Sequence, residues 1–313
     1  MAILAVGSVA YDSVTTPHGS VDEVLGGSAS YFGVAAGFFS PVSLVACVGD
    51  DFRGEDRFFL ESRNIDLKGL EVIEGGETFR WTGDYRNDMN AAETLDTQLN
   101  VFADFNPVIP ASYRGYEYVF LGNIDPLLQR KVLEQVESPR LVVCDTMNFW
   151  IEGSFESLLE TLKFVDVLII NDAETRQLAR EENLIRAVRK ILKWGPSVLV
   201  VKRGEYGAAM FTAKGGNDLD VFAAPAFPQE EILDPTGAGD SFAGGFVGYL
   251  AGTNCVDEES MRQAVIFGSV VASFNIEKFS LERLRELTFT EIRLRFSEYH
   301  KMMHFEGFED VQD

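Results

Sequence analysis

"EILDPTGAGDSFAGGF", residues 231–246, joins a glycine-rich turn to the first residues of an expected helix. Pro235, Gly237 and Gly239 favour a turn, and the residues that follow are small and apolar at helical spacing. A helix N-terminus carries unsatisfied N–H groups and the positive end of the helix dipole, so it binds anions. The stretch therefore predicts an anion hole that needs no basic side chain, with Asp240 in the first helical turn.

An aspartate at the mouth of an anion hole has two interpretations, and the local sequence leaves both open. An acid is favourable in the first turn of any helix. A carboxylate here could also accept the proton of an alcohol that attacks a bound phosphoryl group. The chain has three histidines, His18, His300 and His304, so a histidine base is poorly supplied and the carboxylate is the better candidate.

Other nucleotide-binding motifs do not fit the sequence. The Walker pattern G-x-x-x-x-G-K-[ST] does not occur. A dinucleotide fingerprint that began at Gly237 would need its third glycine at the position of Phe242. The stretch therefore indicates a phosphate site of another kind, and a dinucleotide-dependent oxidoreductase is disfavoured.

Composition narrows the class of protein further. The chain has 313 residues and a formal net charge of -22, which argues against nucleic acid or an anionic membrane as a partner. Three scattered cysteines indicate neither a disulfide framework nor a zinc site. The start lacks the basic region of a signal peptide, and no apolar run approaches the ~20 residues of a membrane helix. We expect a cytoplasmic protein with one large domain and a small inserted one.

Apolar runs that resemble buried strands alternate with helical patterns, which predicts a mainly parallel sheet with helices on both faces. Ligands bind at the carboxyl ends of the strands in such sheets. The expected strands are 2–7, 42–49, 118–124, 141–147, 165–172, 197–204 and 207–213. The expected helices are 28–39, 51–64, 127–137, 157–164, 173–194 and 283–300.

Two segments break this alternation. Residues 10–25 and 72–105 carry Thr and aromatic residues among turn formers, without a helical period. They predict short antiparallel strands that form a β lid domain beside the core. The core domain would then consist of residues 1–9, 26–71 and 106–313.

The stretch 231–246 resembles the C-terminal signature of the ribokinase (PfkB) family of sugar and nucleoside kinases. The resemblance implies a ribokinase-like three-layer αβα sandwich with a mainly parallel sheet and a small β-sheet lid. It also implies that Asp240 is the catalytic base and that the amides of Gly237, Ala238 and Gly239 form the anion hole.

Two further motifs are similar to metal-associated parts of that family. "IINDAET" resembles its N-x-x-E motif, which implies that Asn171 and Glu174 organise Mg²⁺ through water. The same residues also fit a capping box at the start of a helix. Asp234 and Thr236 stand where some members bind a monovalent cation such as K⁺.

The segment 200–211, "VVKRGEYGAAMF", resembles the family's nucleotide-proximal hairpin, and 267–280 resembles the wall of its adenine site. An exposed hairpin and ordinary core packing are the alternatives. The residues assigned to ATP in this way are Lys202, Arg203, Gly204, Gly207, Gly237, Gly239, Gly268, Ala272 and Asn275.

The N-terminal segments "GSVAYDSV" and "GGSASYFG" resemble the family's substrate region. Tyr31 departs from the pattern, because many members have Asn there, and its ring could stack on a substrate or fill the core. The residues assigned to the substrate are Asp12, Gly26, Gly27, Ser28, Tyr31, Trp81, Asn148 and Asp240. Aromatic residues of the lid either close on the substrate or meet a second lid in a homodimer.

These expectations combine into an ATP- and Mg²⁺-dependent kinase that phosphorylates a hydroxymethyl group of a sugar. A nucleoside kinase of the same family is the first alternative, and a catalytically silent ligand-binding protein on the kinase fold is the second. The sequence does not distinguish a sugar from a nucleoside as the acceptor.

Overall fold

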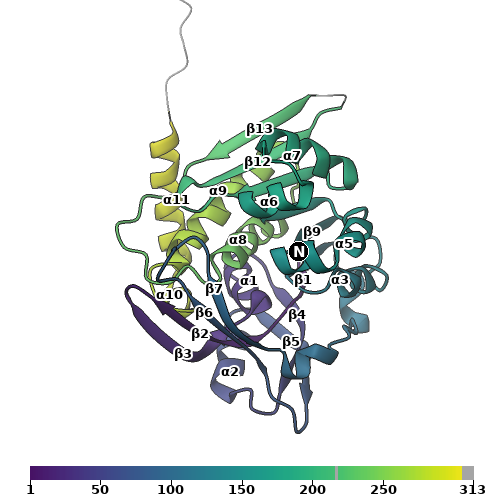
Figure 1. The fold of residues 1–313 in the computed structure, drawn as a ribbon, viewed down its shortest axis with the longest axis vertical. Helices are drawn as coiled ribbons and strands as arrows, with labels where there is room; N and C mark the ends of the chain where they lie inside the picture. The colour runs from purple at the N-terminus through teal and green to yellow at the C-terminus, as the bar shows by residue number, and fades with distance from the viewer. Residues whose placement is uncertain (216–217, 305–313) are drawn as a thin grey trace, which may run out of the picture.

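The computed structural model describes residues 1–215 and 218–304 (Figure 1). A nine-stranded sheet forms its centre, in the order β13-β12-β11-β10-β9-β8-β1-β4-β5. All neighbouring strands from β11 to β5 are parallel, and β12 and β13 are antiparallel additions at one edge. The strands are β1 (Ile3–Val6), β4 (Val42–Gly49), β5 (Ile65–Ile73), β8 (Tyr118–Leu121), β9 (Leu141–Asp145), β10 (Val167–Asn171), β11 (Val198–Lys202), β12 (Ala208–Ala213) and β13 (Leu219–Ala224).

Helices cover both faces of this sheet, because its central strands are apolar on both sides. One core joins the sheet to the face that includes α1, α8 and α9, and a second core joins it to the face that includes α3, α5, α6 and α7. The predicted three-layer architecture is confirmed. The helices of eight or more residues are α1 (Ser28–Ala36), α2 (Gly54–Ser62), α3 (Pro126–Leu133), α5 (Phe155–Leu162), α6 (Asp172–Ala179), α7 (Leu184–Ile191), α8 (Ala238–Thr253), α9 (Glu258–Asn275) and α11 (Phe289–Met303); α4 (Asn148–Gly153) and α10 (Glu282–Glu286) are shorter.

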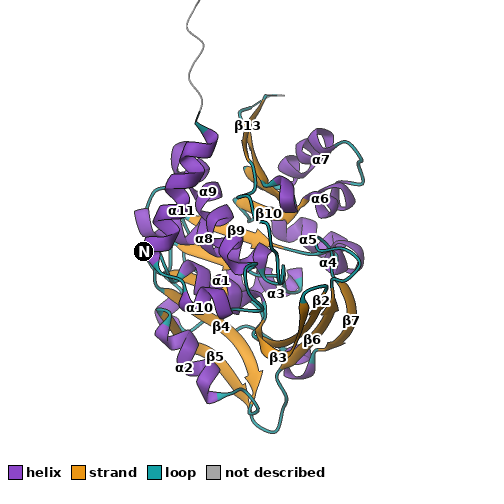
Figure 2. Ribbon diagram, turned by 90° about the vertical axis from the view of Figure 1, so that its left-hand side faces the viewer, coloured by secondary structure: helices purple, strands orange, loops and turns teal. Residues whose placement is uncertain are grey.

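A second sheet of four strands, in the order β3-β2-β6-β7, lies beside the core (Figure 2). Its strands are β2 (Ala10–Thr16), β3 (Gly19–Gly26), β6 (Phe79–Asp84) and β7 (Glu93–Gln98). These strands come from the two segments that were predicted to form the lid. The predicted all-antiparallel pairing is wrong at one place, because β2 and β6 run parallel. They belong to two separate segments, so no hairpin constrains their relative direction.

The sequence-based elements also differ from the structure elsewhere. The helix predicted over 173–194 is two helices, because Arg180 ends α6 in the left-handed region and Asn183 caps α7. The helix predicted over 283–300 is likewise divided, since Thr288 and Glu291 form a capping box that starts α11. β5 and β13 were not predicted, and β5 carries residues 72 and 73 into the main sheet.

None of the helices in residues 1–215 and 218–304 is both long and apolar enough to cross a membrane.

Candidate active site

The carboxyl ends of three neighbouring strands bring polar side chains to one edge of the main sheet. Asp145 is the last residue of β9, Asn171 ends β10 and Lys202 ends β11. The register pairs Asn171 with Lys202 directly. The Lys202 ammonium lies 3.8 Å from a carboxylate oxygen of Asp145, and both side chains are largely shielded from solvent. An ion pair therefore stands where an open parallel sheet places its ligands.

The glycine-rich turn meets this edge at the start of α8. Gly237 precedes the helix with φ 73°, a left-handed conformation that glycine adopts without strain. A Cβ on Gly239 would lie 2.7 Å from Nζ of Lys202, so the ammonium rests against the turn. The predicted anion hole thus combines free N–H groups of a helix N-terminus with one cation.

Two buried side chains hold the turn in place from behind. Asp234 accepts hydrogen bonds from the backbone N–H groups of Thr236 (2.9 Å) and Ser280 (2.8 Å). Asn275 donates from Nδ2 to the Thr236 carbonyl (2.8 Å), and its Oδ1 lies 3.1 Å from the Ser241 hydroxyl. Asn275 is fully buried, and both of these contacts are with residues of the stretch 231–246. Its predicted contact with ATP and the predicted cation at Asp234 and Thr236 stay predictions.

Asp240 lies in the first turn of α8, as predicted, and its environment favours a protonatable base. Burial and the nearby charge of Asp145 raise the pKa of Asp240 to about 7, against the opposing effect of Lys202. For Lys202, burial lowers the pKa, but the Asp145 and Glu174 carboxylates outweigh that effect and raise it. The site therefore contains an acid that can take up a proton near neutral pH beside a lysine that stays charged.

Asn171 and Glu174 form the capping box that was one of their two interpretations. The Asn171 side chain accepts from the Glu174 N–H (2.7 Å), and the Glu174 carboxylate accepts from the Asn171 N–H (2.8 Å). Burial raises the pKa of Glu174 to about 7, and Asp145 adds to the effect. Three neighbouring carboxylates, those of Asp145, Glu174 and Asp240, face one lysine. Within residues 1–215 and 218–304, no group of three or more His, Cys, Asp or Glu side chains is arranged to hold a metal ion directly, so the role of Asn171 and Glu174 in binding Mg²⁺ through water stays a prediction.

The substrate-side residues come together at the base of the lid. Burial raises the pKa of Asp12 to about 7, and the charges of Asp234 and Asp240 add to it. The Asp12 carboxylate fills the space that a Cβ on Gly26 would take, and Gly27 has φ 89° against the Ser8 carbonyl. These two glycines therefore allow the lid and the core to approach closely at Asp12.

The other predicted substrate residues differ in their burial and in their contacts with the base of the lid. Ser28 is buried and exchanges two hydrogen bonds with Ser8. Trp81 pairs in register with Asp12 and donates to Thr94 (3.2 Å). Tyr31 is only 1% exposed, which favours the core-filling interpretation of its ring. Asn148 is exposed at the start of α4.

The residues assigned to ATP fall into two groups. Arg203 and Gly204 are exposed on the turn after β11, near the phosphate side of the site. Gly207, with φ 88°, closes that turn where a Cβ would meet the backbone of β13. Gly268 lies where α9 packs on the Phe242 carbonyl of α8, which is a packing role.

Sequence reasoning missed Asp145, and it placed Tyr85 among the lid aromatics without its contact to Thr236. Asp145 ends the buried run "LVVCD", and an acid at the carboxyl end of a buried strand was a usable signal. The Tyr85 hydroxyl accepts from the Thr236 hydroxyl at 3.4 Å, so the lid touches the glycine-rich turn at the start of α8, residues 234–239, which we call the anion turn. No local sequence pattern predicts this long-range contact.

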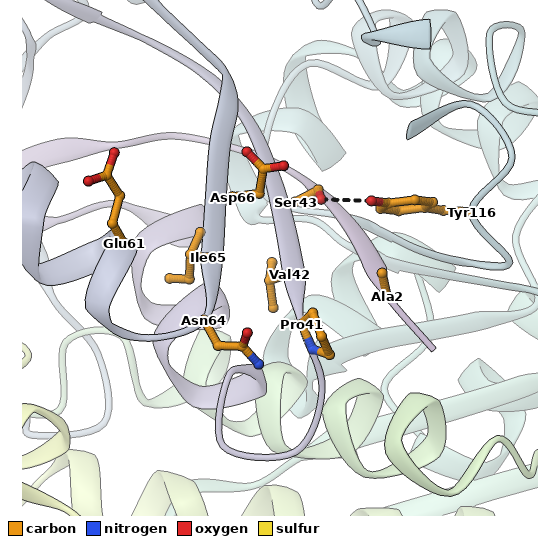
Figure 3. Close-up of a pocket in the computed structure, with 9 residues that line it drawn as sticks. All are labelled: Ala2, Pro41, Val42, Ser43, Glu61, Asn64, Ile65, Asp66 and Tyr116. Atoms are coloured by element: carbon orange, nitrogen blue, oxygen red, sulfur yellow. Dashed lines mark hydrogen bonds between the residues drawn. The ribbon is translucent and has the colours of Figure 1, made fainter. Parts of the chain in front are cut away.

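A hollow of about 330 Å³ lies elsewhere on the molecule (Figure 3). Its lining includes Ala2, Pro41 and Asn64, each directly before a strand, and a hydrogen bond of 3.1 Å joins Ser43 to Tyr116. It therefore lies at the amino edge of the sheet, opposite the carboxyl edge that carries the candidate site.

Comparisons with known proteins agree with this geometry. Residues 124–285 match the family described as pfkB family carbohydrate kinase. The chain is 28% identical over 255 residues to the cytidine kinase of Thermococcus kodakarensis, covering 80% of this chain and 89% of the relative. It is 25% identical over 238 residues to the nucleoside kinase of Methanocaldococcus jannaschii, covering 75% and 72%. Aminoimidazole riboside kinase from Salmonella enterica, solved with aminoimidazole riboside and an ATP analogue, has the same fold, with a TM-score of 0.74, 17% identity, and coverage of 95% and 100%.

Proposed function

The chain belongs to the pfkB family of carbohydrate kinases, and on that premise we propose that it transfers the γ-phosphoryl group of ATP to a hydroxymethyl group of a nucleoside. Phosphotransfer to an alcohol is the reaction class of this family, as the sequence predicted. A nucleoside as the acceptor is supported by two relatives, named cytidine kinase and nucleoside kinase, which match three quarters or more of this chain. They favour the nucleoside alternative over the sugar that was the main expectation.

In this proposal, Asp240 accepts the proton of the attacking hydroxyl group. Its pKa of about 7 suits that task, because the carboxylate is largely ionised at slightly alkaline pH and still basic enough to hold a proton. The N–H groups of Gly237 and Gly239 stabilise the charge that develops on the transferring phosphoryl group. The Ala238 N–H donates to the Pro235 carbonyl (3.1 Å) in this structure, so it would have to turn from that carbonyl to join them. Lys202, held by Asp145, neutralises a further part of that charge.

Mg²⁺ would bind through water near Glu174 and Asp145, and when bound it neutralises the phosphate oxygens of ATP. Asn171 contributes by fixing the Glu174 carboxylate through the capping box. Asp234 and Thr236 remain our candidates for a K⁺ site, for which stimulation of turnover by K⁺ over Na⁺ is the direct test.

Asp12 and the Gly26–Gly27 backbone would bind the acceptor. A carboxylate can accept from two neighbouring hydroxyl groups, which suits the vicinal diol of a ribose. The buried Asp12 carboxylate would then distinguish acceptors that have this diol from acceptors that lack it. Closure of the lid over this place would keep water away from the phosphoryl group.

A substrate panel tests the proposal. Cytidine, uridine, adenosine, guanosine, inosine, ribose and fructose are each incubated with Mg–ATP, and ADP release is measured. We expect one ribonucleoside to exceed every free sugar by about 100-fold in kcat/KM, since a site built for polar groups rejects ligands that leave them unpaired. The Asp240→Asn variant serves as the blank for contaminating kinases. A preferred free sugar would restore the first expectation, and no turnover with any acceptor would favour the silent ligand-binding protein.

A further inference from the structure

The connection between β6 and β7, residues 85–92, reaches from the lid sheet toward the core helices (Figure 1). We call this segment the lid loop. At its beginning, the Tyr85 hydroxyl meets Thr236 of the anion turn at 3.4 Å. Further along, Oδ1 of Asn90 occupies the space in which a Cβ on Gly204 would lie. The lid loop therefore touches the phosphate site at one place and the turn after β11 at another.

The shape of the lid loop is set by hydrogen bonds of its own. The Asp84 carboxylate accepts from the Arg86 N–H (2.8 Å) and also pairs with the Arg86 guanidinium. The Asp88 carboxylate accepts from the Asn90 N–H (2.8 Å). Two short side-chain turns therefore fix where the backbone of Asn90 lies, and its side chain is presented to Gly204 without depending on that contact.

Gly204 stands close to the charges of the site. It follows Lys202 by two residues, and the Lys202 ammonium rests against Gly239 at the start of α8. Among residues 1–215 and 218–304, no hydrogen-bond partner is found for the side-chain amide of Asn90. An amide N–H next to a phosphate site is a neutral donor, and it adds no negative charge to a place that already holds Asp145, Glu174 and Asp240.

We propose that Asn90 completes the nucleotide subsite from the lid. In this arrangement its carboxamide packs on Gly204 and donates its N–H groups to the phosphate oxygens of a bound nucleoside triphosphate. The inference rests on the proposed kinase function and extends it. It makes Asn90 a binding residue for the phosphate donor, although the lid itself closes over the acceptor.

One consequence is coupling between the two ligands. If the acceptor favours the closed lid, it also favours the position of Asn90 that contacts the nucleotide. Each ligand then raises the affinity for the other by the same factor, as linkage requires. Without the Asn90 contact, that factor should fall toward one.

The test is calorimetric titration with the magnesium complex of AMP-PNP, a nonhydrolysable ATP analogue, on the full chain. We expect Asn90→Ala to weaken binding about tenfold, which is the size of a lost hydrogen bond to a charged group. The matched control is Asn87→Ala in the same exposed lid loop, which should stay within about twofold of the wild type. With the best acceptor of the panel, Asn90→Ala should raise KM for ATP about tenfold, and KM for the acceptor at saturating ATP should rise by no more than the coupling factor that is lost.

Gly204→Ala provides a second, independent measurement. An added methyl group would displace the Asn90 side chain, so Asn90→Ala should cost little further affinity in the Gly204→Ala background. Additive losses in the double variant, or equal losses in Asn87→Ala and Asn90→Ala, would overturn the inference. Unchanged AMP-PNP binding by Asn90→Ala would overturn the role of Asn90 and leave the kinase function standing. A wild-type chain that binds no Mg–AMP-PNP would refute both the kinase function and the role of Asn90.

Discussion

The ring of Tyr31 lies against the α-carbon of Gly237, in the space that a side chain at position 237 would take. Tyr31 belongs to α1 and is almost fully buried, whereas Gly237 is the residue before α8, at the predicted anion hole. The two helices also pack closely along their length, since Gly244 and Gly248 of α8 leave no room for side chains against α1. The core thus supports the glycine-rich turn directly.

This contact predicts that Gly237→Ala damages both stability and activity. The methyl group would meet the Tyr31 ring, and alanine at φ 73° is strained by about 1–2 kcal/mol. Together with overpacking, we expect a loss of about 2–4 kcal/mol in the free energy of unfolding, measured by urea titration. We also expect kcat to fall at least about 100-fold, because one misplaced donor of an oxyanion-type hole costs that much.

Gly54→Ala is the matched control for this prediction, because a Cβ there would meet nothing within 4 Å. It should leave stability within about 0.5 kcal/mol of the wild type. A Gly237→Ala variant as stable and as active as Gly54→Ala would show that the Tyr31 ring does not constrain the turn.

Asp240 should give the reaction a single acidic limb in its pH profile. A base must be ionised to accept a proton, and burial with the charge of Asp145 raises the pKa of Asp240 to about 7. At saturating acceptor and Mg–ATP, where the acceptor already engages the Asp12 carboxylate, kcat should therefore rise about tenfold per pH unit below pH 7 and level off above about pH 8. Asp240→Asn should lower kcat by about three orders of magnitude or more and remove the limb. A flat profile from pH 5.5 to 9 in the wild type would contradict the assignment.

The anion turn could be predicted from the sequence because its signals are local. Glycines at the turn, a proline before it and small residues after it all lie within 231–246. Asn171, Lys202 and Asp240 could be placed at one edge for a related reason, since each ends a strand or starts a helix in a parallel α/β pattern.

The contacts that complete the site could not be predicted in this way. Tyr85 meets Thr236 across 151 residues of chain, and Asn90 meets Gly204 across more than a hundred. These pairings depend on β2 and β6 running parallel, which places the end of β6 and the lid loop beyond it above the turn. No hydrophobic period records the relative direction of two strands from separate segments.

Asp145→Asn should shift the acidic limb toward lower pH. The negative charge of Asp145 raises the pKa of Asp240, so removing that charge lets Asp240 ionise at lower pH. The same change removes the ion-pair partner of Lys202 at 3.8 Å, so we expect KM for ATP to rise several-fold. Glu160→Gln, which breaks an exposed pair with Lys163, is the control and should change neither quantity. A limb that moves to higher pH would mean that loss of the Lys202 position outweighs loss of the Asp145 charge.

Asp12 should make the protein less stable as pH rises from about 4 to 7. Burial raises its pKa in the folded chain to about 7 from an ordinary 3.8, so the folded state holds the proton where the unfolded state releases it. Ionisation therefore favours unfolding across that window, and the cost is constant above pH 7. Asp12→Asn has no such cost and should gain about 2–4 kcal/mol in the free energy of unfolding relative to the wild type between pH 4.5 and 8.

The measurement for Asp12 is the urea midpoint at pH 4.5 and at pH 8, with exposed Asp104→Asn as the control. The variant should also lose acceptor binding, which would mark the buried acid as a residue that lowers stability in return for recognition of the substrate. A difference between Asp12→Asn and the wild type that stays the same at both pH values would show that the folded chain does not hold the Asp12 proton. In that case the carboxylate would already be ionised beneath the lid and ready to accept the hydroxyl groups of a substrate.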